Sequence, residues 1–390
     1  MERFGGFLRR WIFPYLPYPH FMGLAPLDSV LALLFRTRAR VPVALWPRLA
    51  LLLFFSALAT VLTLPERLAI AVWLKLRPRR IAPHEAPVLV LGYFRSGTTW
   101  LQTLLSLDPA LRTPLWLEVL SPHTFVVTWT VLRVILAPFL WLVRIRAVSP
   151  LAPTLPAEDD FAMCAWARAS IVAGRAVLPG EQDFYNRFHD LERLTPAERS
   201  RWERHEMAFV GKLMLISGGR RLVLKSPSHM ARVRHLLRLF PGAKFIHITR
   251  PPRAVFQSNL ALIKGLQDAF RLTRPIAPEV QEEMIVADYL ATMDRYLADR
   301  RLIPLGDLAE VRLQDLAADP VGELARIYAE LGLTFSDAFR LRLAKYLAAR
   351  RRRRPLVHPP LTPAQEARAA RLDRLGPLLA HDRALDDRQT

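Results

Sequence analysis

Hydrophobic and polar residues follow two rhythms from residue 87 onward. Short apolar runs with the length of buried strands occupy residues 87–93, 221–226 and 243–250. Each run is followed by a segment with the apolar spacing of a helix, at 98–107, 229–240 and 251–262. This alternation predicts an α/β fold in which helices flank a parallel sheet.

A further helix is predicted by a local motif. Thr195-Pro196-Ala197-Glu198 is a capping box with proline in the first helical position, and the helix it opens is expected to end near Leu215. The last third of the chain is expected to be mostly helical. We expect three parts, which are an apolar helical segment at 1–80, an α/β domain at 81–345 and a basic C-terminal extension at 346–390.

The N-terminal pattern differs, because it is apolar over a long stretch. Residues 49–64 carry no charge, but 16 residues of helix measure about 24 Å, less than the roughly 30 Å hydrocarbon core of a bilayer. Basic residues flank this run on both sides, so the positive-inside rule gives no orientation. A second apolar stretch, 124–143, is interrupted by Arg133 and Pro138.

Together the two stretches predict a monotopic or re-entrant membrane contact rather than a clean span. Seven aromatic residues among basic ones, from Phe4 to Phe21, favour the same interpretation. The alternative is that both stretches form buried core helices.

Charge and cysteine content narrow the possible partners. The formal net charge is +20, and 49 of the 55 basic residues are arginine. Such a composition suits an anionic membrane surface, an anionic substrate or nucleic acid, and genomic base bias is the alternative explanation of the arginine excess. No nucleic-acid-binding motif is present, so we expect no nucleic-acid partner. The single cysteine, Cys164, excludes an intrachain disulfide and a cysteine-based zinc site.

The first motif with chemical content lies between a predicted strand and a predicted helix. Residues 92–100 read Gly-Tyr-Phe-Arg-Ser-Gly-Thr-Thr-Trp. A glycine loop that opens a helix directs backbone N–H groups and the helix dipole at an anion, so we predict phosphate binding here. The lysine that follows the second glycine of a Walker A loop is missing, and Arg95 lies inside the loop instead, which argues against a nucleoside triphosphatase.

A second motif follows the predicted strand at 243–250. Arg250 ends this strand, where an Mg²⁺-binding enzyme would carry an acidic residue. Ser258 lies about two turns into the next helix. A guanidinium group and a hydroxyl at this offset are able to hold another phosphate.

These motifs identify the chain as resembling sulfotransferases that use 3′-phosphoadenosine-5′-phosphosulfate (PAPS), in the bacterial and tyrosylprotein-type branch. Residues 94–100 are similar to the 5′-phosphosulfate loop of that family, and Arg250 with Ser258 is similar to its 3′-phosphate motif. Residues 222–258 and 311–333 extend the resemblance. Two departures are Phe94, where the family usually has proline, and Gln314, where it usually has an acidic residue.

The resemblance implies PAPS as co-substrate, 3′-phosphoadenosine-5′-phosphate as product and no metal. Arg95 would stabilise the transferring sulfuryl group, and Lys225 would contact that group or the bridging oxygen. Trp100 would stack on the adenine, although a core tryptophan is the alternative. Ser226 is expected at most to cap the next helix. The expected nucleotide-binding set is Arg95, Ser96, Gly97, Thr98, Thr99, Trp100, Arg250 and Ser258.

The sequence leaves the identity of the general base open. By resemblance it is Glu118, which lies 23 residues after Arg95; a salt-bridged structural glutamate is the alternative. His123 and the cluster Glu158-Asp159-Asp160 are rivals, and the cluster also suits a helix N-terminus. The run Arg350–Arg354 suits a contact with the 3′-phosphate, binding of anionic lipid or a solvated surface.

The sequence therefore predicts a membrane-associated sulfotransferase acting on an acceptor hydroxyl, on a lipid or lipid-linked molecule. Its catalytic domain would face the cytoplasm if the protein is bacterial, and no oligomeric state is predicted. The alternatives are a P-loop kinase that uses ATP and Mg²⁺, and a catalytically silent nucleotide-binding scaffold at the membrane.

Overall fold

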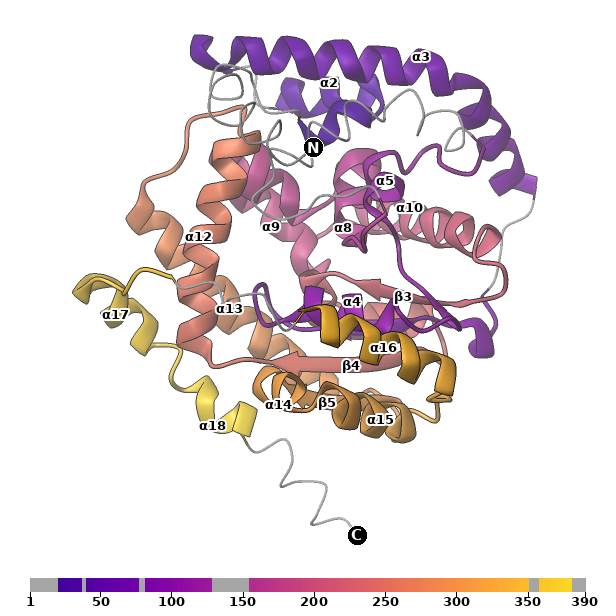
Figure 1. Cartoon of the computed structure of the whole chain (residues 1–390). Helices are drawn as coiled ribbons and strands as arrows, with labels where there is room; N and C mark the ends of the chain where they lie inside the picture. The colour runs from indigo at the N-terminus through magenta and orange to yellow at the C-terminus, as the bar shows by residue number, and fades with distance from the viewer. Residues whose placement is uncertain (1–19, 37–39, 77–80, 128–153, 351–357, 381–390) are drawn as a thin grey trace. The chain divides into compact units, whose positions relative to one another are not determined.

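The computed structural model describes residues 20–36, 40–76, 81–127, 154–350 and 358–380 (Figure 1). The chain forms two compact units. Unit 1 comprises Met1–Arg80, Pro114–Gly218 and Gly265–Pro275, and unit 2 comprises Ile81–Thr113, Gly219–Lys264 and Ile276–Thr390. The domain boundaries expected at residues 80 and 345 stay predictions.

Unit 2 is built on a parallel five-stranded sheet with the order β2-β3-β1-β4-β5. Its strands are β1 (Val88–Leu91), β2 (Leu111–Arg112), β3 (Arg221–Lys225), β4 (Lys244–Thr249) and β5 (Leu308–Arg312). The three predicted strands are confirmed as the central ones, and the predicted α/β fold is confirmed with them. The two edge strands, β2 and β5, were not predicted.

Helices cover both faces of this sheet. The helices of unit 2 are α4 (Thr98–Leu105), α11 (Val233–Leu239), α13 (Pro278–Arg300), α14 (Leu313–Ala318), α15 (Pro320–Glu330), α16 (Asp337–Arg350), α17 (Pro363–Ala370) and α18 (Leu375–Ala380). Helices α4, α14, α15 and α16 share one buried apolar cluster with Ile246 and Ile248 of β4. His247 points to the other face, where its ring lies 4.2 Å from that of Tyr296 on α13.

Unit 1 is helical. Among its described residues the helices are α2 (Leu27–Arg36), α3 (Trp46–Leu76), α5 (Trp116–Leu120), α8 (Asp159–Ala162), α9 (Gln182–Asp190) and α10 (Pro196–Leu215), while α12 (Pro252–Phe270) begins in unit 2 and ends in unit 1. The predicted capping box is confirmed, because Thr195 Oγ1 accepts a hydrogen bond from Glu198 N at the start of α10. Short π-helical turns at Met163–Ala167 and Ala173–Val177 interrupt the regular helices.

Helix α3 is the longest element that the structure describes. It continues beyond the predicted apolar run and bends along its length (Figure 1), as expected for a helix that contains Pro65. Within the described residues, Val43–Trp73 is the one helical stretch long and apolar enough to cross a membrane. Only 28% of its most apolar window is buried, so α3 is not a core helix.

Other N-terminal expectations fall partly outside the described residues. The aromatic residues from Phe4 to Tyr18, and residues 128–143 of the second apolar stretch, lie there. Phe21 is described and is buried against Phe161 and Phe270. Phe21 therefore does not belong to a membrane-facing surface.

Candidate active site

The loop between β1 and α4 has the geometry that a phosphate cradle requires. A Cβ atom on Gly92 would lie 2.8 Å from the carbonyl oxygen of Ile248, and one on Gly97 would lie 2.7 Å from Leu313 Cδ1. Gly97, with φ of 106°, is also the left-handed N-cap of α4. The loop can therefore pack closely against the sheet. The N–H groups of the first turn of α4 face this loop.

Three of the predicted site residues meet in this loop. Arg95 Nε donates a hydrogen bond of 2.8 Å to Ser258 Oγ, and Arg250 Nη1 donates one of 3.1 Å to the Arg95 carbonyl oxygen. Arg95 itself has a φ of 70°, which is unusual for a side chain other than glycine and marks a strained, over-determined position. The two predicted phosphate motifs, although distant in sequence, form one cationic cluster.

Lys225 extends this cluster from the end of β3. Its side chain is buried, and Nζ donates a hydrogen bond of 3.3 Å to Thr99 Oγ1 in the first turn of α4. A buried ammonium group is costly unless an anion or other acceptors compensate it. Burial also lowers the pKa of Arg250, although a guanidinium group keeps its charge at ordinary pH.

Two supporting contacts were not predicted. Asn259, the residue after Ser258, donates from Nδ2 to the Phe94 carbonyl oxygen at 2.9 Å. Tyr93 donates from its hydroxyl to Asp288 Oδ2 at 2.8 Å, and its ring stacks on that of Tyr289. Both contacts hold the loop in place, but they depend on tertiary neighbours and have no local sequence motif.

Comparison with known proteins identifies the family of this site. The profile described as the sulfotransferase family matches residues 87–337, which include the whole cluster. The chain is also 32% identical over 324 residues to omega-hydroxy-beta-dihydromenaquinone-9 sulfotransferase Stf3 of Mycobacterium bovis and of Mycobacterium tuberculosis. That alignment covers 81% of this chain and 79% of each relative. The chain belongs to the sulfotransferase family.

Solved structures share the fold of this sulfotransferase. Sulfotransferase STF1 from Mycobacterium tuberculosis matches with a TM-score of 0.63 and 21% identity, over 89% of this chain and 92% of that one. Sulfotransferase STF9 from Mycobacterium avium matches with a TM-score of 0.64 and 21% identity, over 90% and 95% of the two chains. None of these findings supports the kinase that the sequence left as an alternative.

Two other predicted residues of the sulfotransferase have clear positions. Ser226 is confirmed as a cap, because its hydroxyl accepts a hydrogen bond from Ser228 N at the start of the 3₁₀ helix Pro227–Ala231. Trp100 is half-buried on α4 and packs against the apolar cluster beside the sheet. Its stacking on adenine stays a prediction.

Glu118, the predicted base, lies in unit 1. Its side chain is 5% exposed, and Oε2 accepts a hydrogen bond of 2.9 Å from Leu115 N at the start of α5. This bond gives Glu118 a structural role as the third residue of a capped helix. The catalytic role of Glu118 stays a prediction. A substitution that preserves the cap can test the catalytic role separately from the structural one.

His123, the rival base, is buried in unit 1. Burial and the nearby cations Lys212 and Arg67 hold its pKa well below the usual range, so the imidazole is neutral near pH 7. Lys212 is itself buried, and burial lowers its pKa to about 7. A base with a strongly lowered pKa has little driving force for proton abstraction, so this environment weakens His123 as a candidate base.

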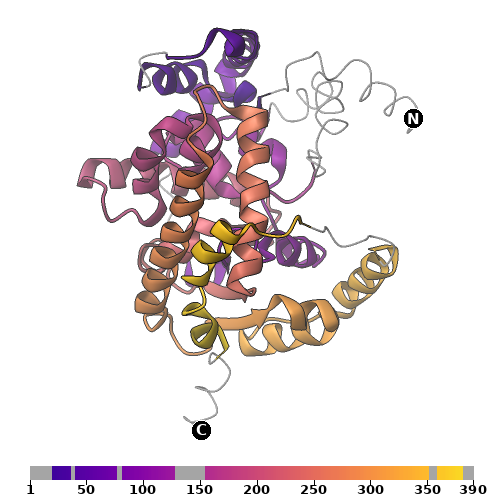
Figure 2. The ribbon, with the colours of Figure 1, turned by 90° about the vertical axis from the view of Figure 1, so that its left-hand side faces the viewer.

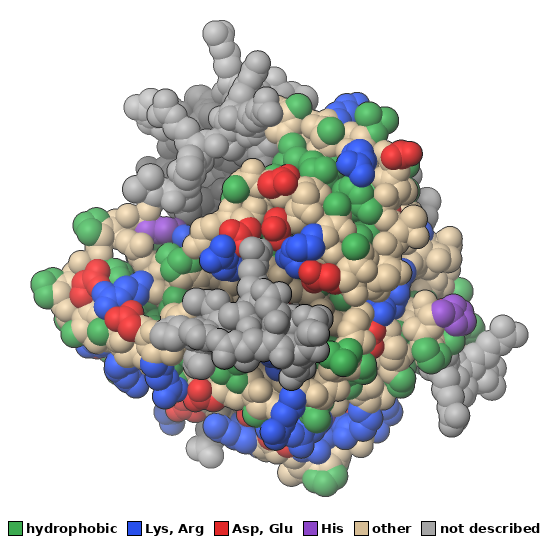
Figure 3. Space-filling model, turned by 90° about the horizontal axis from the view of Figure 1, so that it is seen from below, with side chains coloured by type: hydrophobic (Ala, Val, Ile, Leu, Met, Phe, Trp, Pro, Cys, Tyr) green, Lys and Arg blue, Asp and Glu red, His purple; other side chains and the backbone are tan. Residues whose placement is uncertain are grey.

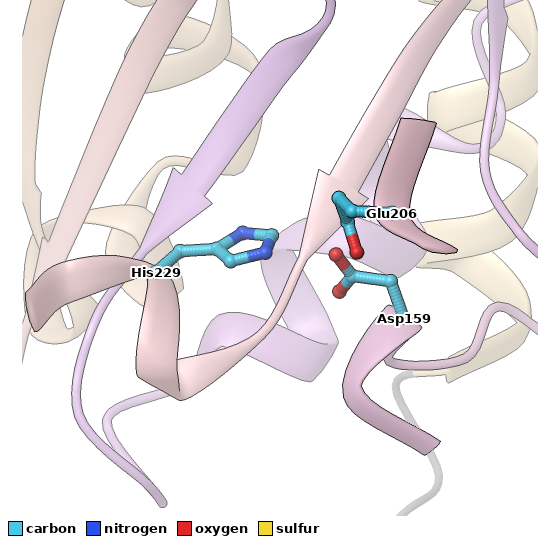
Figure 4. A group of neighbouring side chains, drawn as sticks. All are labelled: Asp159, Glu206 and His229. Atoms are coloured by element: carbon cyan, nitrogen blue, oxygen red, sulfur yellow. The ribbon is translucent and has the colours of Figure 1, made fainter. Parts of the chain in front are cut away.

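The acidic cluster is confirmed as the start of a helix, since Glu158 is the N-cap of α8 and Asp159 and Asp160 form its first turn. Figure 4 shows that the carboxylate of Asp159 points toward that of Glu206 on α10, and the two groups have oxygens within 4.8 Å. His229, also labelled there, belongs to unit 2. Glu206 was missed because it lies inside an ordinary charged helix with no motif.

A C-terminal strap, residues 358–375, follows α12 and α13 within unit 2 (Figure 2). Arg253 donates to Glu366 and Asp373, each at 2.7 Å, and Gln257 Nε2 donates to the Pro359 carbonyl oxygen at 2.6 Å. At the start of the strap, partial burial and the charges of Arg95 and Arg250 lower the pKa of His358. His358 is thus a neighbour of the cationic cluster that the sequence did not reveal.

Basic side chains are mixed with acidic ones on one described face of the molecule. On the face seen in Figure 3, Lys and Arg side chains are interspersed with Asp and Glu side chains. In unit 2, Arg371 pairs with Glu283 and Arg374 with Asp294. The run Arg350–Arg354 lies outside the side chains that the structure describes, so its three interpretations stay open.

Proposed function

We propose that this sulfotransferase takes its sulfuryl group from PAPS and transfers it to a hydroxyl group of a membrane lipid. The observation that carries the donor assignment is the contact of Arg95 with both Ser258 and Arg250. One loop thereby joins two anion-binding motifs, as a nucleotide with phosphate groups on both sides of its ribose requires. Arg250 and Ser258 bind the 3′-phosphate, while the first turn of α4 binds the 5′-phosphosulfate.

In the transfer step, the acceptor oxygen forms a bond to sulfur while the bond from sulfur to the departing phosphate oxygen breaks. The acceptor proton passes to Glu118, and 3′-phosphoadenosine-5′-phosphate leaves. Arg95 and Lys225 are held by Ser258 and Thr99, so both cations are positioned before charge develops on the leaving oxygen.

Two observations support a lipid acceptor. The relative Stf3 is named for a menaquinone-derived acceptor, which is a lipid with a hydroxyl group. Helix α3 exposes a long apolar surface, as a protein that meets its substrate at a membrane would. We propose that the protein lies at the membrane and that, if it is bacterial, its nucleotide site faces the cytoplasm.

Calorimetry on the full-length protein in detergent, without Mg²⁺, tests the nucleotide site. We expect micromolar binding of 3′-phosphoadenosine-5′-phosphate and a loss of at least about tenfold in Arg250→Ala, which removes charge-assisted hydrogen bonds to phosphate. Arg312→Ala is the matched control, since Arg312 lies at the end of β5 and its guanidinium group pairs with the carboxylate of Asp315.

Binding of ATP with Mg²⁺ in place of this nucleotide would overturn the donor assignment. The acceptor is tested by transfer of radiolabelled sulfate from PAPS into a total lipid extract. Label that enters only water-soluble metabolites would reject a lipid acceptor and leave the donor assignment intact.

A further inference from the structure

Helix α3 buries a row of mixed polarity and exposes large apolar side chains. The side facing unit 1 is formed by residues that are each less than 10% exposed and spaced three or four apart, namely Leu52, Ser56, Ala59, Thr63, Glu66 and Ile70. The opposite side carries large apolar side chains that are 40–71% exposed, including Leu51, Phe54, Leu58, Val61, Leu62, Leu64, Leu68 and Val72. We call this second surface the outer face of α3. A helix of a soluble domain has the opposite arrangement.

Polar groups attach the inner face of α3 to unit 1. Ser56 Oγ donates to the Ala25 carbonyl oxygen at 2.7 Å, and Thr60 Oγ1 accepts from Leu27 N at 2.9 Å. Glu66 Oε1 accepts from the N–H groups of Val126 and Val127 at 2.8 and 3.1 Å. The buried polar side chains of α3 are therefore used by the protein, and they fix which side faces outward.

A further attachment lies at the start of the helix. Arg48 donates from Nη1 to the Arg271 carbonyl oxygen and from Nη2 to that of Asp268, both at 2.9 Å and both within unit 1. The attached row from Leu52 to Ile70 corresponds to about 27 Å of helix, close to the thickness of a hydrocarbon core. If α3 crossed a bilayer, the polar part of unit 1 packed along it would have to enter the hydrocarbon too, at a large cost for its charged groups.

The outer face has the chemistry of a lipid-binding surface. No charged residue occurs from residue 49 to residue 65. Trp46, 58% exposed, lies at the beginning of the helix, with exposed Arg40 before it. An apolar face bordered by an aromatic residue and basic residues suits the interfacial region of an anionic membrane, where tryptophan and arginine meet the headgroups.

We infer that α3 lies flat in the membrane interface, with its outer face in the acyl region and its inner face on unit 1, and does not span the bilayer. This inference rests on the proposed function only in its choice of a lipid bilayer, rather than a second copy of the chain, as the occupant of the outer face. It makes the protein monotopic. The acceptor hydroxyl would be reached from the same leaflet on which α3 rests.

Depth measurements with spin labels distinguish a flat helix from a spanning one. The chain has one native cysteine, buried Cys164, so single-cysteine variants are made on a Cys164→Ala background. Labels at Leu51, Leu58 and Leu68 are measured in vesicles of phosphatidylcholine and phosphatidylglycerol. A flat helix places all three at similar, shallow depth. A maximum of depth at Leu58 with shallow ends would show a span and overturn the inference.

A matched pair of substitutions tests the energetic role of the outer face. Val61→Glu, at a site 71% exposed, is expected to weaken vesicle binding at least about tenfold, because it replaces apolar burial by a charge. Leu341→Glu, at a site 73% exposed on α16 in unit 2, should leave binding unchanged. Equal effects of the two substitutions would reject the outer face as the binding surface.

Two further measurements separate this inference from the proposed function. Vesicle binding requires neither donor nor acceptor, and nucleotide calorimetry requires no vesicle. Nucleotide binding without vesicle binding would reject the membrane role of α3 and leave the donor assignment intact. Vesicle binding without nucleotide binding would reject the donor assignment and leave the membrane role intact. A dimer in ultracentrifugation that Val61→Glu dissociates, with no vesicle binding by the unmodified protein, would assign the outer face to a second copy.

Discussion

Helix α15 of unit 2 and helix α3 of unit 1 differ in which polar and apolar residues they bury and expose. Helix α15 buries Leu324, Ile327 and Tyr328 and exposes Glu330, as a helix against an aqueous surface does. Helix α3 buries Ser56, Thr63 and Glu66 and exposes leucine, valine and phenylalanine. Apolar spacing therefore shows which side chains share a face, while the tertiary contacts of the helix decide which face is covered by protein.

The two units also differ in the functional features that they carry. Unit 2 holds the cations of the nucleotide site, and unit 1 carries the apolar outer face together with Glu118. If Glu118 is the base, unit 1 contributes chemistry as well as attachment. The following tests probe that division, beginning with the largest expected effect.

Glu118→Gln is expected to lower the turnover number by about 10²–10⁴, the usual contribution of a general base. Glutamine preserves the cap, because its side-chain oxygen can accept the hydrogen bond from Leu115 N that Glu118 Oε2 now accepts. The measurement is the rate of labelled sulfate transfer from PAPS into lipid, with the melting temperature recorded alongside. His123→Gln and Asp159→Asn are the rival variants, and full activity of Glu118→Gln would assign the base elsewhere.

His20 tests the stability of unit 1. Its Nε2 donates to the Phe270 carbonyl oxygen at 2.8 Å, while Nδ1 accepts from Met22 N. Both nitrogens of the neutral ring therefore form hydrogen bonds. Burial lowers its pKa from 6.5 to about 4. The stabilisation is present above pH 6.5 and is lost as the pH falls toward 4, because the unfolded chain then binds the proton more tightly.

We expect this loss to reach about 3 kcal/mol between pH 7 and pH 4. Denaturant unfolding of the full-length protein in detergent should show it, and His20→Gln should make the profile flatter by a similar amount. His84→Gln, at an exposed site in unit 2, serves as control. An unchanged acid profile in His20→Gln would show that this ring is not a source of acid sensitivity.

Gly97 tests the phosphate loop of unit 2 with a smaller change. Gly97→Ala places a Cβ against Leu313 at φ of 106°, and we expect a loss of about 1–3 kcal/mol in the free energy of unfolding, together with weaker nucleotide binding. Gly265→Ala in α12 meets nothing within 4 Å and should instead stabilise by about 0.5–1 kcal/mol. A stable, nucleotide-binding Gly97→Ala variant would show that the loop tolerates a side chain there.

Much of unit 2 could be predicted because its information is local. The central strands are apolar throughout, and the glycine loop follows one of them directly. Strand β5 escaped prediction because Glu310 lies in its middle. The structure explains that residue, since Arg300 donates to Glu310 Oε1 at 3.1 Å and Tyr296 donates to it at 2.9 Å. A partner contributed by another helix allows a charged residue in a strand that the local pattern would not predict.

The sequence predicted the main residues of the site but not the residues that hold them in place or lie beside them. Arg95, Arg250 and Ser258 stand out through their motifs, and the structure brings them into contact. Asn259 and His358 carry no motif, because one holds a carbonyl oxygen of the loop and the other arrives on a strap attached elsewhere. Residues of this kind can be recognised only from their positions in the folded structure.

Local sequence is enough to predict the central strands, the glycine loop after β1, the two phosphate motifs and the uncharged run of α3. Each depends on neighbours along the chain, through strand propensity, the conformational freedom of Gly97 and the absence of charge. Which residues of α3 face the protein depends on tertiary contacts. The run from Leu49 to Pro65 has no charge that marks one face in the sequence, and the choice depends on a few hydrogen bonds: Ser56, Thr60 and Glu66 find partners on unit 1, and this leaves the apolar side outward.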